Sequence, residues 1–340
     1  MSPLPSPRPL PRLRGVDRAR FEAEIVPAGR PVVLEGLVAD WPAVAAGQTP
    51  KGLRSYLAGL DAGRPVQVFR AAPEVQGRYS YSDDLKGRNH GPVQMGLTTL
   101  LDEMLALAGE SQPASVYAGG VPAPLCLPGL AEANPMPLLD PARERLTSLW
   151  VGNRSTTATH WDLPQNLACV IAGRRRFVLF PTTQVANLYV GPLDFTLAGQ
   201  PISLVDVDAP DLERFPRFAE AWAEAEVAEL APGDAIYVPS LWFHNVGSLE
   251  PVGAMVNFWW RDGPQWLTTP MFTLFHALLT LRDLPPRERE AWRVFFDHYI
   301  FQTGGEPMAH IPEDARGLFG PMTPEALARL RAMLARPLTR

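Results

Sequence analysis

Cysteine and lysine are scarce in this 340-residue sequence. The only two cysteines, Cys126 and Cys169, do not form a CxxC motif, and they are too few for a disulfide framework. We therefore expect two small buried hydrophobic side chains in a protein of the reducing cytoplasm. Lysine occurs only at Lys51 and Lys86, so nearly every cationic side chain is an arginine.

Long apolar runs and an excess of positive charge are also missing. No stretch reaches the roughly 20 apolar residues of a membrane span, and the formal net charge is −5 with a pI near 5.7. A protein that binds polyanions needs a basic surface, and the sequence shows no convincing basic patch. We expect neither a membrane nor a nucleic-acid partner.

The first 15 residues, MSPLPSPRPLPRLRG, are rich in proline and arginine. They lack the apolar stretch of a signal peptide, and we predict a flexible arm over residues 1–15. The chain as a whole is 46% hydrophobic and 20% charged, which is the balance of a globular protein with a substantial core.

Short apolar or alternating runs, separated by glycine, proline or aspartate, dominate residues 147–262. Because little helix lies between them, this spacing predicts an antiparallel barrel or sandwich. An insertion over 209–225 is expected to end in a short helix. Nearer the N-terminus we predict strands at 32–34 and 65–71 and helices near 51–60 and 97–109, the second capped by Thr98 or Thr99. The predicted class is mainly β with added helices.

The character of the chain changes after Asp262, where three helical stretches follow. They carry more large apolar side chains than a helical tail can bury against itself, so they should pack on the barrel or on a second subunit. We predict a β-rich domain over 16–262 and a helical region over 263–340 that forms a homodimer.

The candidate chemistry begins in residues 155–166, STTATHWDLPQN, where His160 and Asp162 stand two positions apart. Side chains two apart on a strand share a face, so both can reach one point. His244 follows in LAPGDAIYVPSLWFHNV and supplies a third ligand. Two histidines and one carboxylate leave open positions on a ferrous ion for a co-substrate and oxygen. HxD alone is a weak pattern, and the joint pattern is more specific.

With these motifs in order, the chain resembles the JmjC-type, cupin-like oxygenases that depend on iron(II) and 2-oxoglutarate. Within that family it is most similar to the branch of the asparaginyl hydroxylase that inhibits hypoxia-inducible factor. The stretches that carry the resemblance run from RPVVLEGLVADWPA to NFWWRD, and they include TTATHWDLPQN, GRRRFVLFP and PGDAIYVPSLWFHNV. The resemblance implies a double-stranded β-helix, the cupin or jelly-roll barrel, with dimerising C-terminal helices.

The resemblance also implies roles for individual residues. His160, Asp162 and His244 would ligate catalytic iron(II). The 2-oxoglutarate co-substrate would be bound by five further residues, of which Thr157 would contact its distal carboxylate: Tyr117, Thr157, Asn166, Arg175 and Asn257. The implied reaction uses molecular oxygen to hydroxylate a C–H bond of a protein side chain or a small molecule, with succinate and CO2 as co-products.

The departure from the branch is Arg175, which stands where the branch has a lysine that pairs with the C5 carboxylate of 2-oxoglutarate. Arginine can bind a carboxylate through two hydrogen bonds, although its fork is larger than an ammonium group. On a strand, Arg175 shares a face with Phe177 and Leu179, whereas Arg174 and Arg176 lie on the opposite face. The two flanking arginines are expected to be solvated.

Two alternatives remain open from the sequence. The first is a cupin metalloenzyme that keeps the metal but does not use 2-oxoglutarate. The second is a dimeric binding module without catalysis, in which the barrel only presents a groove. An intact set of three ligands argues against the second alternative, because a degenerate site could lose any one of them.

Overall fold

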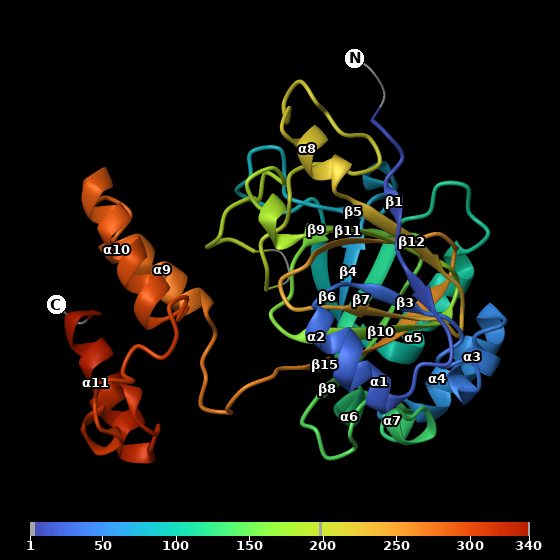
Figure 1. Ribbon diagram of the computed structural model, residues 1–340. Helices are drawn as coiled ribbons and strands as arrows, with labels where there is room; N and C mark the ends of the chain where they lie inside the picture. Colours follow the sequence, from blue (N-terminus) through green and yellow to red (C-terminus); the bar gives the residue numbers. More distant parts are fainter. Residues whose placement is uncertain (1–3, 197–198, 339–340) are drawn as a thin grey trace. The chain divides into compact units, whose positions relative to one another are not determined.

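The computed structural model describes residues 4–196 and 199–338, and the chain divides into two compact units, Met1–Gly263 and Pro264–Arg340. The first unit is built on two β-sheets (Figure 1). The six-stranded sheet has the order β1 (Arg8–Pro9), β12 (Glu226–Leu230), β11 (Arg175–Phe180), β14 (Phe243–Ser248), β9 (Thr156–His160) and β5 (Arg78–Tyr79).

The nine-stranded sheet contains the remaining strands. Its order is β2 (Arg12–Leu13), β3 (Val32–Leu34), β13 (Ala235–Val238), β10 (Gln165–Ala172), β15 (Gly253–Trp260), β8 (Leu146–Gly152), β7 (Ser115–Pro122), β4 (Pro65–Ala71) and β6 (Gly91–Gly96). The inner pairs, such as β10 with β13 and β11 with β14, are antiparallel. The predicted class, a mainly β jelly-roll barrel with added helices, is confirmed.

Two apolar layers hold this unit together. Between the sheets, Phe177 and Leu179 of β11 pack with Val170 of β10 and Met255 of β15. A larger cluster covers the outer face of the nine-stranded sheet, where side chains of the sheet meet those of the surrounding helices. Burial on both faces explains why β10 reads as a nearly continuous apolar run.

The helices of the first unit lie mainly on the outer side of the nine-stranded sheet (Figure 1). Their bounds are α1 (Arg18–Arg20), α2 (Val26–Ala28), α3 (Pro42–Ala46), α4 (Pro50–Leu60), α5 (Leu97–Leu107), α6 (Ala123–Cys126) and α7 (Leu130–Ala133), with a π-helical turn at Phe21–Ile25. Helix α8 (Phe218–Ala223) ends the insertion over 209–225, as predicted. Two 3-10 turns lie at Pro73–Val75 and Thr182–Gln184.

Three local predictions differ from the structure. Strands β1 and β2, inside the expected flexible arm, pair with β12 and β3, and Arg12 forms ion pairs with Glu35 and Asp234. These contacts are tertiary, so the arm's composition does not show them. The N-cap of α5 is Gly96, because the Thr98 hydroxyl donates to Asp61 instead. The prolines that crowd residues 122–141 predict irregular structure there, but the stretch contains α6 and α7.

Both thiols are buried and unpaired, as expected, and burial raises the pKa of the Cys169 thiol. The second unit consists of α9 (Met271–Thr280), α10 (Pro286–Tyr299) and α11 (Pro324–Leu338), with 3-10 turns at Glu313–Ala315 and Gly317–Phe319. Neither α9 nor α10 buries a residue. Among the described residues, no helix combines the length and the apolar character needed to cross a bilayer.

Candidate metal centre

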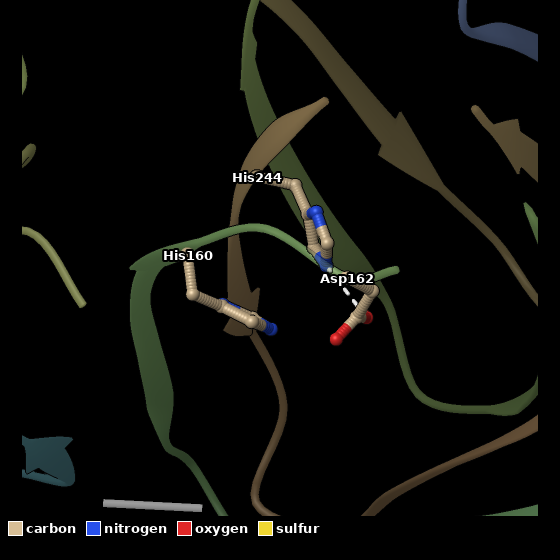
Figure 2. Close-up of side chains that lie close together, drawn as sticks. All are labelled: His160, Asp162 and His244. Carbon is tan, nitrogen blue, oxygen red and sulfur yellow. Dashed lines mark ion pairs between the residues drawn. The ribbon is translucent and has the colours of Figure 1, made fainter. Parts of the chain in front are cut away.

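The three predicted ligands converge at one point. His160 ends β9 and is the register partner of His244 in the neighbouring strand β14, while Asp162 lies two residues beyond β9. One donor atom from each of His160, Asp162 and His244 lies within 4.8 Å of the other two. Figure 2 shows all three side chains pointing toward a common space. The group can hold a metal ion.

Backbone carbonyl groups orient both imidazole rings. Nδ1 of His160 lies 2.9 Å from the Ala158 oxygen, and Nδ1 of His244 lies 3.0 Å from the Trp242 oxygen. A carbonyl only accepts hydrogen bonds, so each Nδ1 donates to its carbonyl and each Nε2 is turned toward the common space. Hydrogen bonds of this kind fix ring orientation in metal sites.

The charges of the three groups suit a divalent cation. Burial, followed by the neighbouring His244, lowers the pKa of His160 to about 4, so this ring is neutral at pH 7. Burial alone would raise the pKa of Asp162, but the contact with His244 and the charge interaction with His160 outweigh it and lower the pKa. A metal requires deprotonated ligands, and these residues already supply a carboxylate and a neutral imidazole.

A small cavity adjoins the ligands and contains every predicted co-substrate residue. Its walls include His160, Asp162, His244 and the five residues Tyr117, Thr157, Asn166, Arg175 and Asn257. The five co-substrate side chains come from five different strands, β7, β9, β10, β11 and β15. The structure therefore brings together all eight residues selected from the sequence.

Arg175 is the unusual member of this cavity. Its side chain is only 2% exposed, and its Nε and Nη2 atoms are buried without a hydrogen-bond partner. Burial lowers the pKa of the Arg175 guanidinium to about 10, which leaves it protonated at neutral pH. A buried charge without a counter-charge is strongly unfavourable. The cavity thus fits an anionic ligand with a carboxylate near Arg175.

A glycine makes room for the guanidinium. A Cβ atom at Gly253, the first residue of β15, would lie 3.1 Å from Nη2 of Arg175 and 3.0 Å from Oγ of Ser248. Ser248 is also the register partner of Arg175 in β14. An arginine needs more space here than the lysine of the related branch, and the missing side chain of Gly253 provides it.

The remaining polar residues of the cavity are neutral. Burial raises the pKa of the Tyr117 phenol to about 12, so it stays a hydrogen-bond donor at physiological pH. Asn257 donates from Nδ2 to Oδ1 of Asn166 over 3.2 Å. The Oδ1 atom of Asn257 is buried without a partner, which leaves one acceptor for a bound molecule.

The two neighbours of Arg175 face the other way, as the alternation predicted. Arg174 forms ion pairs with Glu229 and Glu250, and Arg176 pairs with Asp208 at 2.8 Å. Only the inward arginine lacks a carboxylate partner among the described residues. The strand register therefore selects one arginine of the three for the cavity.

Sequence reasoning missed the aromatic walls and the glycines behind them. Trp150 and Trp259 line the cavity, and a Cβ at Gly119 would lie 2.9 Å from the Trp150 ring. Gly119 and Gly120 sit where the register between β7 and β8 shifts. Two consecutive glycines within a strand pattern were the available signal, because such pairs mark a bulge or a close approach.

Comparisons with known proteins agree with this geometry. The family profile described as "Cupin-like domain" matches residues 18–265. A mouse (Mus musculus) protein named tRNA wybutosine-synthesizing protein 5 is 27% identical over 331 residues, which cover 83% of this chain and 92% of the mouse protein.

Two further relatives match over a shorter part of the chain. The Arabidopsis thaliana protein named lysine-specific demethylase JMJ31 is 34% identical over 116 residues, or 34% of this chain and 21% of that protein. Human (Homo sapiens) HSPB1-associated protein 1 is 35% identical over 115 residues, or 33% of this chain and 23% of the human protein. The chain therefore matches less than a quarter of these two relatives.

Proposed function

The chain belongs to the cupin-like, JmjC-type family, and from that premise we propose that it is an Fe(II)- and 2-oxoglutarate-dependent oxygenase. The observation that carries the proposal is a buried, unpartnered arginine in the same cavity as an intact set of three metal ligands. Members of this family typically hold iron and 2-oxoglutarate in such a cavity. The positive charge of Arg175 would be balanced by one carboxylate of the 2-oxoglutarate dianion.

In this proposal His160, Asp162 and His244 would hold ferrous iron, because their donor atoms lie within 4.8 Å of one another. When bound, iron supplies the chemistry by which oxygen converts 2-oxoglutarate to succinate and CO2 and hydroxylates a C–H bond. Arg175 pairs with the distal carboxylate of 2-oxoglutarate through two hydrogen bonds. Tyr117 and Thr157 donate hydrogen bonds to the same carboxylate, and Asn257 with Asn166 contacts the co-substrate nearer the metal.

The aromatic walls have a separate task. Trp150 and Trp259 are in contact, with ring centroids 5.6 Å apart, and Trp150 also contacts Tyr117 at 6.1 Å. Packed rings of this size exclude water, and a dry cavity strengthens the charge interactions of Arg175. The same rings narrow the space that a substrate C–H can use.

The test of the proposal is turnover of 2-oxoglutarate by protein loaded with ferrous iron. We expect succinate to form with the wild-type chain and not with His160→Ala or Asp162→Ala. Iron that binds without any binding or decarboxylation of 2-oxoglutarate would instead support a cupin metalloenzyme with another substrate. Failure to take up iron, zinc or manganese would support a binding module without catalysis.

The substrate has two leading candidates. A protein side chain is favoured by the resemblance of the motifs to the asparaginyl hydroxylase branch. A base carried by tRNA is favoured by the mouse relative, which matches over most of its length. The net charge of −5 favours the protein side chain, because tRNA binding needs a basic surface. Succinate formation measured with peptide, tRNA and metabolite panels separates the candidates.

We also propose that residues 16–262 form the catalytic domain and that residues 263–340 form a homodimer interface. Large apolar side chains are exposed in the second unit, including Phe272 at 64%, Leu279 at 73% and Phe295 at 53%. Surfaces of this kind mark protein contacts. The mass in solution, measured by light scattering, should be that of two chains, and a monomer would contradict this proposal.

A further inference from the structure

The metal ligands lie on two connections that pass from one sheet to the other. Residues 161–164 join β9 of the six-stranded sheet to β10 of the nine-stranded sheet, and residues 239–242 join β13 to β14 in the reverse direction. His160 and Asp162 lie at the first connection, and His244 follows the second. The geometry of the metal site therefore depends on how these two connections are held together.

The ladder of the nine-stranded sheet does not extend into these connections, although His160 and His244 are register partners in the six-stranded sheet. The ladder between β10 and β13 ends at the pair Asn166 and Val238. Beyond that pair, Pro164 stands in one connection and Pro239 in the other. Proline has no N–H group and cannot continue a ladder. Asp162 lies in neither ladder, so other hydrogen bonds hold the connection that carries it.

Four hydrogen bonds link the two connections at this point. On the main chain, the Leu241 N–H donates to the Asp162 carbonyl at 2.9 Å. The Ser240 hydroxyl donates to the Leu163 carbonyl at 2.7 Å. The Oε1 atom of Gln165 accepts both the Tyr237 hydroxyl at 2.7 Å and the Ser240 N–H at 3.2 Å. We call the six residues that make these bonds the clasp: Asp162, Leu163, Gln165, Tyr237, Ser240 and Leu241.

Backbone strain lies within the clasp. Leu241 has φ of +65°, a left-handed conformation that is rare for a residue with a side chain. Its N–H donates to Asp162, and its carbonyl accepts the Thr182 hydroxyl at 2.9 Å. Such a conformation is strained and persists only where the surroundings enforce it, commonly at functional sites. Here it occurs three residues before His244.

We propose that Gln165 is a positioning residue of the metal centre and acts by closing the clasp. The inference rests on the metal-binding part of the proposed function. One oxygen atom of Gln165 accepts from Tyr237 of β13 and from Ser240 of the connection that leads to His244. Gln165 itself follows Asp162 by three residues, so it links the two ligand-bearing segments directly. Tyr237 is fully buried, so loss of this oxygen would leave its hydroxyl unpaired and loosen the link.

The test is metal affinity, measured with Co2+ by visible absorption on the purified full-length apoprotein. Gln165→Met keeps the bulk of the side chain and removes the accepting oxygen. Loss of a residue that orients metal ligands typically weakens affinity by about 10–100-fold, and we expect a rise of this size in the Co2+ dissociation constant. Tyr237→Phe removes one donor of two and should give a smaller rise. A dissociation constant for Gln165→Met within twofold of wild type overturns the proposal.

Control variants separate positioning from general loss of structure. Asp262→Ala removes the partner of Gln165 Nε2, at 3.3 Å, and an ion pair with Arg143. Neither interaction belongs to the clasp, so Co2+ affinity should be unchanged. The double variant Gln165→Glu with Asp262→Asn exchanges the amide and the carboxylate and keeps an accepting oxygen at position 165. In contrast to Gln165→Met, it should bind Co2+ with the affinity of wild type. If Gln165→Met does not fold, Ser240→Ala tests the same clasp by removing its bond to Leu163, and wild-type affinity in that variant overturns the proposal.

The outcome also distinguishes this inference from the proposed function. If the wild-type protein binds Co2+ but never turns over 2-oxoglutarate, the proposed oxygenase function is wrong. The Co2+ dissociation constants of the variants would still support the clasp. Wild-type protein that binds no Co2+ would overturn both. A lower melting temperature of Gln165→Met with unchanged Co2+ affinity would assign the clasp to stability alone and overturn the positioning role.

Discussion

Arginine side chains on the two faces of strand β11 have opposite surroundings. On the outer face, Arg174 and Arg176 each have carboxylate partners. On the inner face, Arg175 is 2% exposed and has two nitrogen atoms without a partner. The outer arginines pair with carboxylates of the protein, whereas these two nitrogen atoms of Arg175 have no partner among the residues that the structure describes. The difference supports the proposal that an anionic co-substrate binds beside Arg175.

The largest expected effect comes from removing the metal ligands on the inner face. Asp162→Ala and His160→Ala each delete one of three donors and leave the outer face unchanged. We expect succinate formation to fall to background and Fe(II) binding to be lost, because two donors hold the ion poorly. Iron content and succinate are both measurable on the purified variants. Normal turnover by Asp162→Ala would show that the three residues are not the metal site.

A comparison of Arg175→Met with Arg176→Met tests the contrast between the faces directly. Truncating one partner of a buried charge pair costs about 2–5 kcal/mol, so we expect Arg175→Met to weaken 2-oxoglutarate binding by about 100-fold. Arg176→Met removes a partly exposed ion pair and should change binding less than about twofold.

The stability of the apoprotein should not fall in Arg175→Met, although 2-oxoglutarate binding does. Arg175→Met removes a buried, unpaired charge, so its melting temperature without ligand should equal or exceed that of wild type. Adding 2-oxoglutarate should raise the melting temperature of the metal-loaded wild type and not that of the variant. Equal loss of binding in both arginine variants would remove the distinction between the faces.

A smaller effect is expected at Gly253, which makes room for the inner arginine. In Gly253→Ala the new methyl group would lie 3.1 Å from Arg175 Nη2, so the guanidinium must shift. We expect the KM for 2-oxoglutarate to rise about tenfold, which corresponds to about 1.4 kcal/mol. The effect should shrink in an Arg175→Lys background, because the ammonium group is smaller. An equal effect of Gly253→Ala in both backgrounds would contradict direct crowding.

The smallest effect concerns His90, a half-buried histidine that is neutral at pH 7. His90 packs between Phe69 and Tyr79 at 5.3 and 5.0 Å, and burial, followed by the charge of Arg88, lowers its pKa to about 4. Between pH 6.5 and 4 the unfolded chain takes up a proton that the folded chain does not. The stability that His90 contributes is therefore present above pH 6.5 and is lost as the pH falls toward 4.

Thermal unfolding measured between about pH 7 and pH 4 tests this effect, because the ordinary pKa of histidine, about 6.5, lies in that range. We expect His90→Phe to reduce the loss of stability on acidification, by less than about 1 kcal/mol because His90 is partly exposed. The exposed His310 provides the matched control, and His310→Gln should leave the pH profile unchanged. A steeper acid profile for His90→Phe would contradict the assignment.

Alternation and motif order allowed much of the site to be predicted. The ligand set came from two motifs, and the inward direction of Arg175 followed from the two-residue period of a strand. Strand β4 was predicted at its observed bounds, because its alternation is regular. Strands β9 and β14 were not predicted as separate elements, since Thr156–His160 and Phe243–Ser248 contain many polar residues. They face a polar cavity, which hides the usual pattern.

The features that escaped prediction depend on contacts between distant segments. The clasp joins residues more than 70 positions apart, and no local pattern announces that Gln165 meets Ser240. The spacing of Gly253 from Arg175 is likewise visible only once β15 and β14 lie against β11. The ordered segment around Arg12 depends on Glu35 and Asp234, which belong to other parts of the chain. Long-range partners decide these elements.

The central claim is that the inner arginine and the three ligands bind 2-oxoglutarate and iron together. Anaerobic titration of 2-oxoglutarate into the Fe(II)-loaded protein, followed through the visible iron–2-oxoacid charge-transfer band, tests it most directly. We predict a band that saturates at one 2-oxoglutarate per chain, requires far more co-substrate in Arg175→Met, and is unchanged in Arg176→Met. A wild-type protein that holds iron and shows no band at any concentration of 2-oxoglutarate would contradict the account.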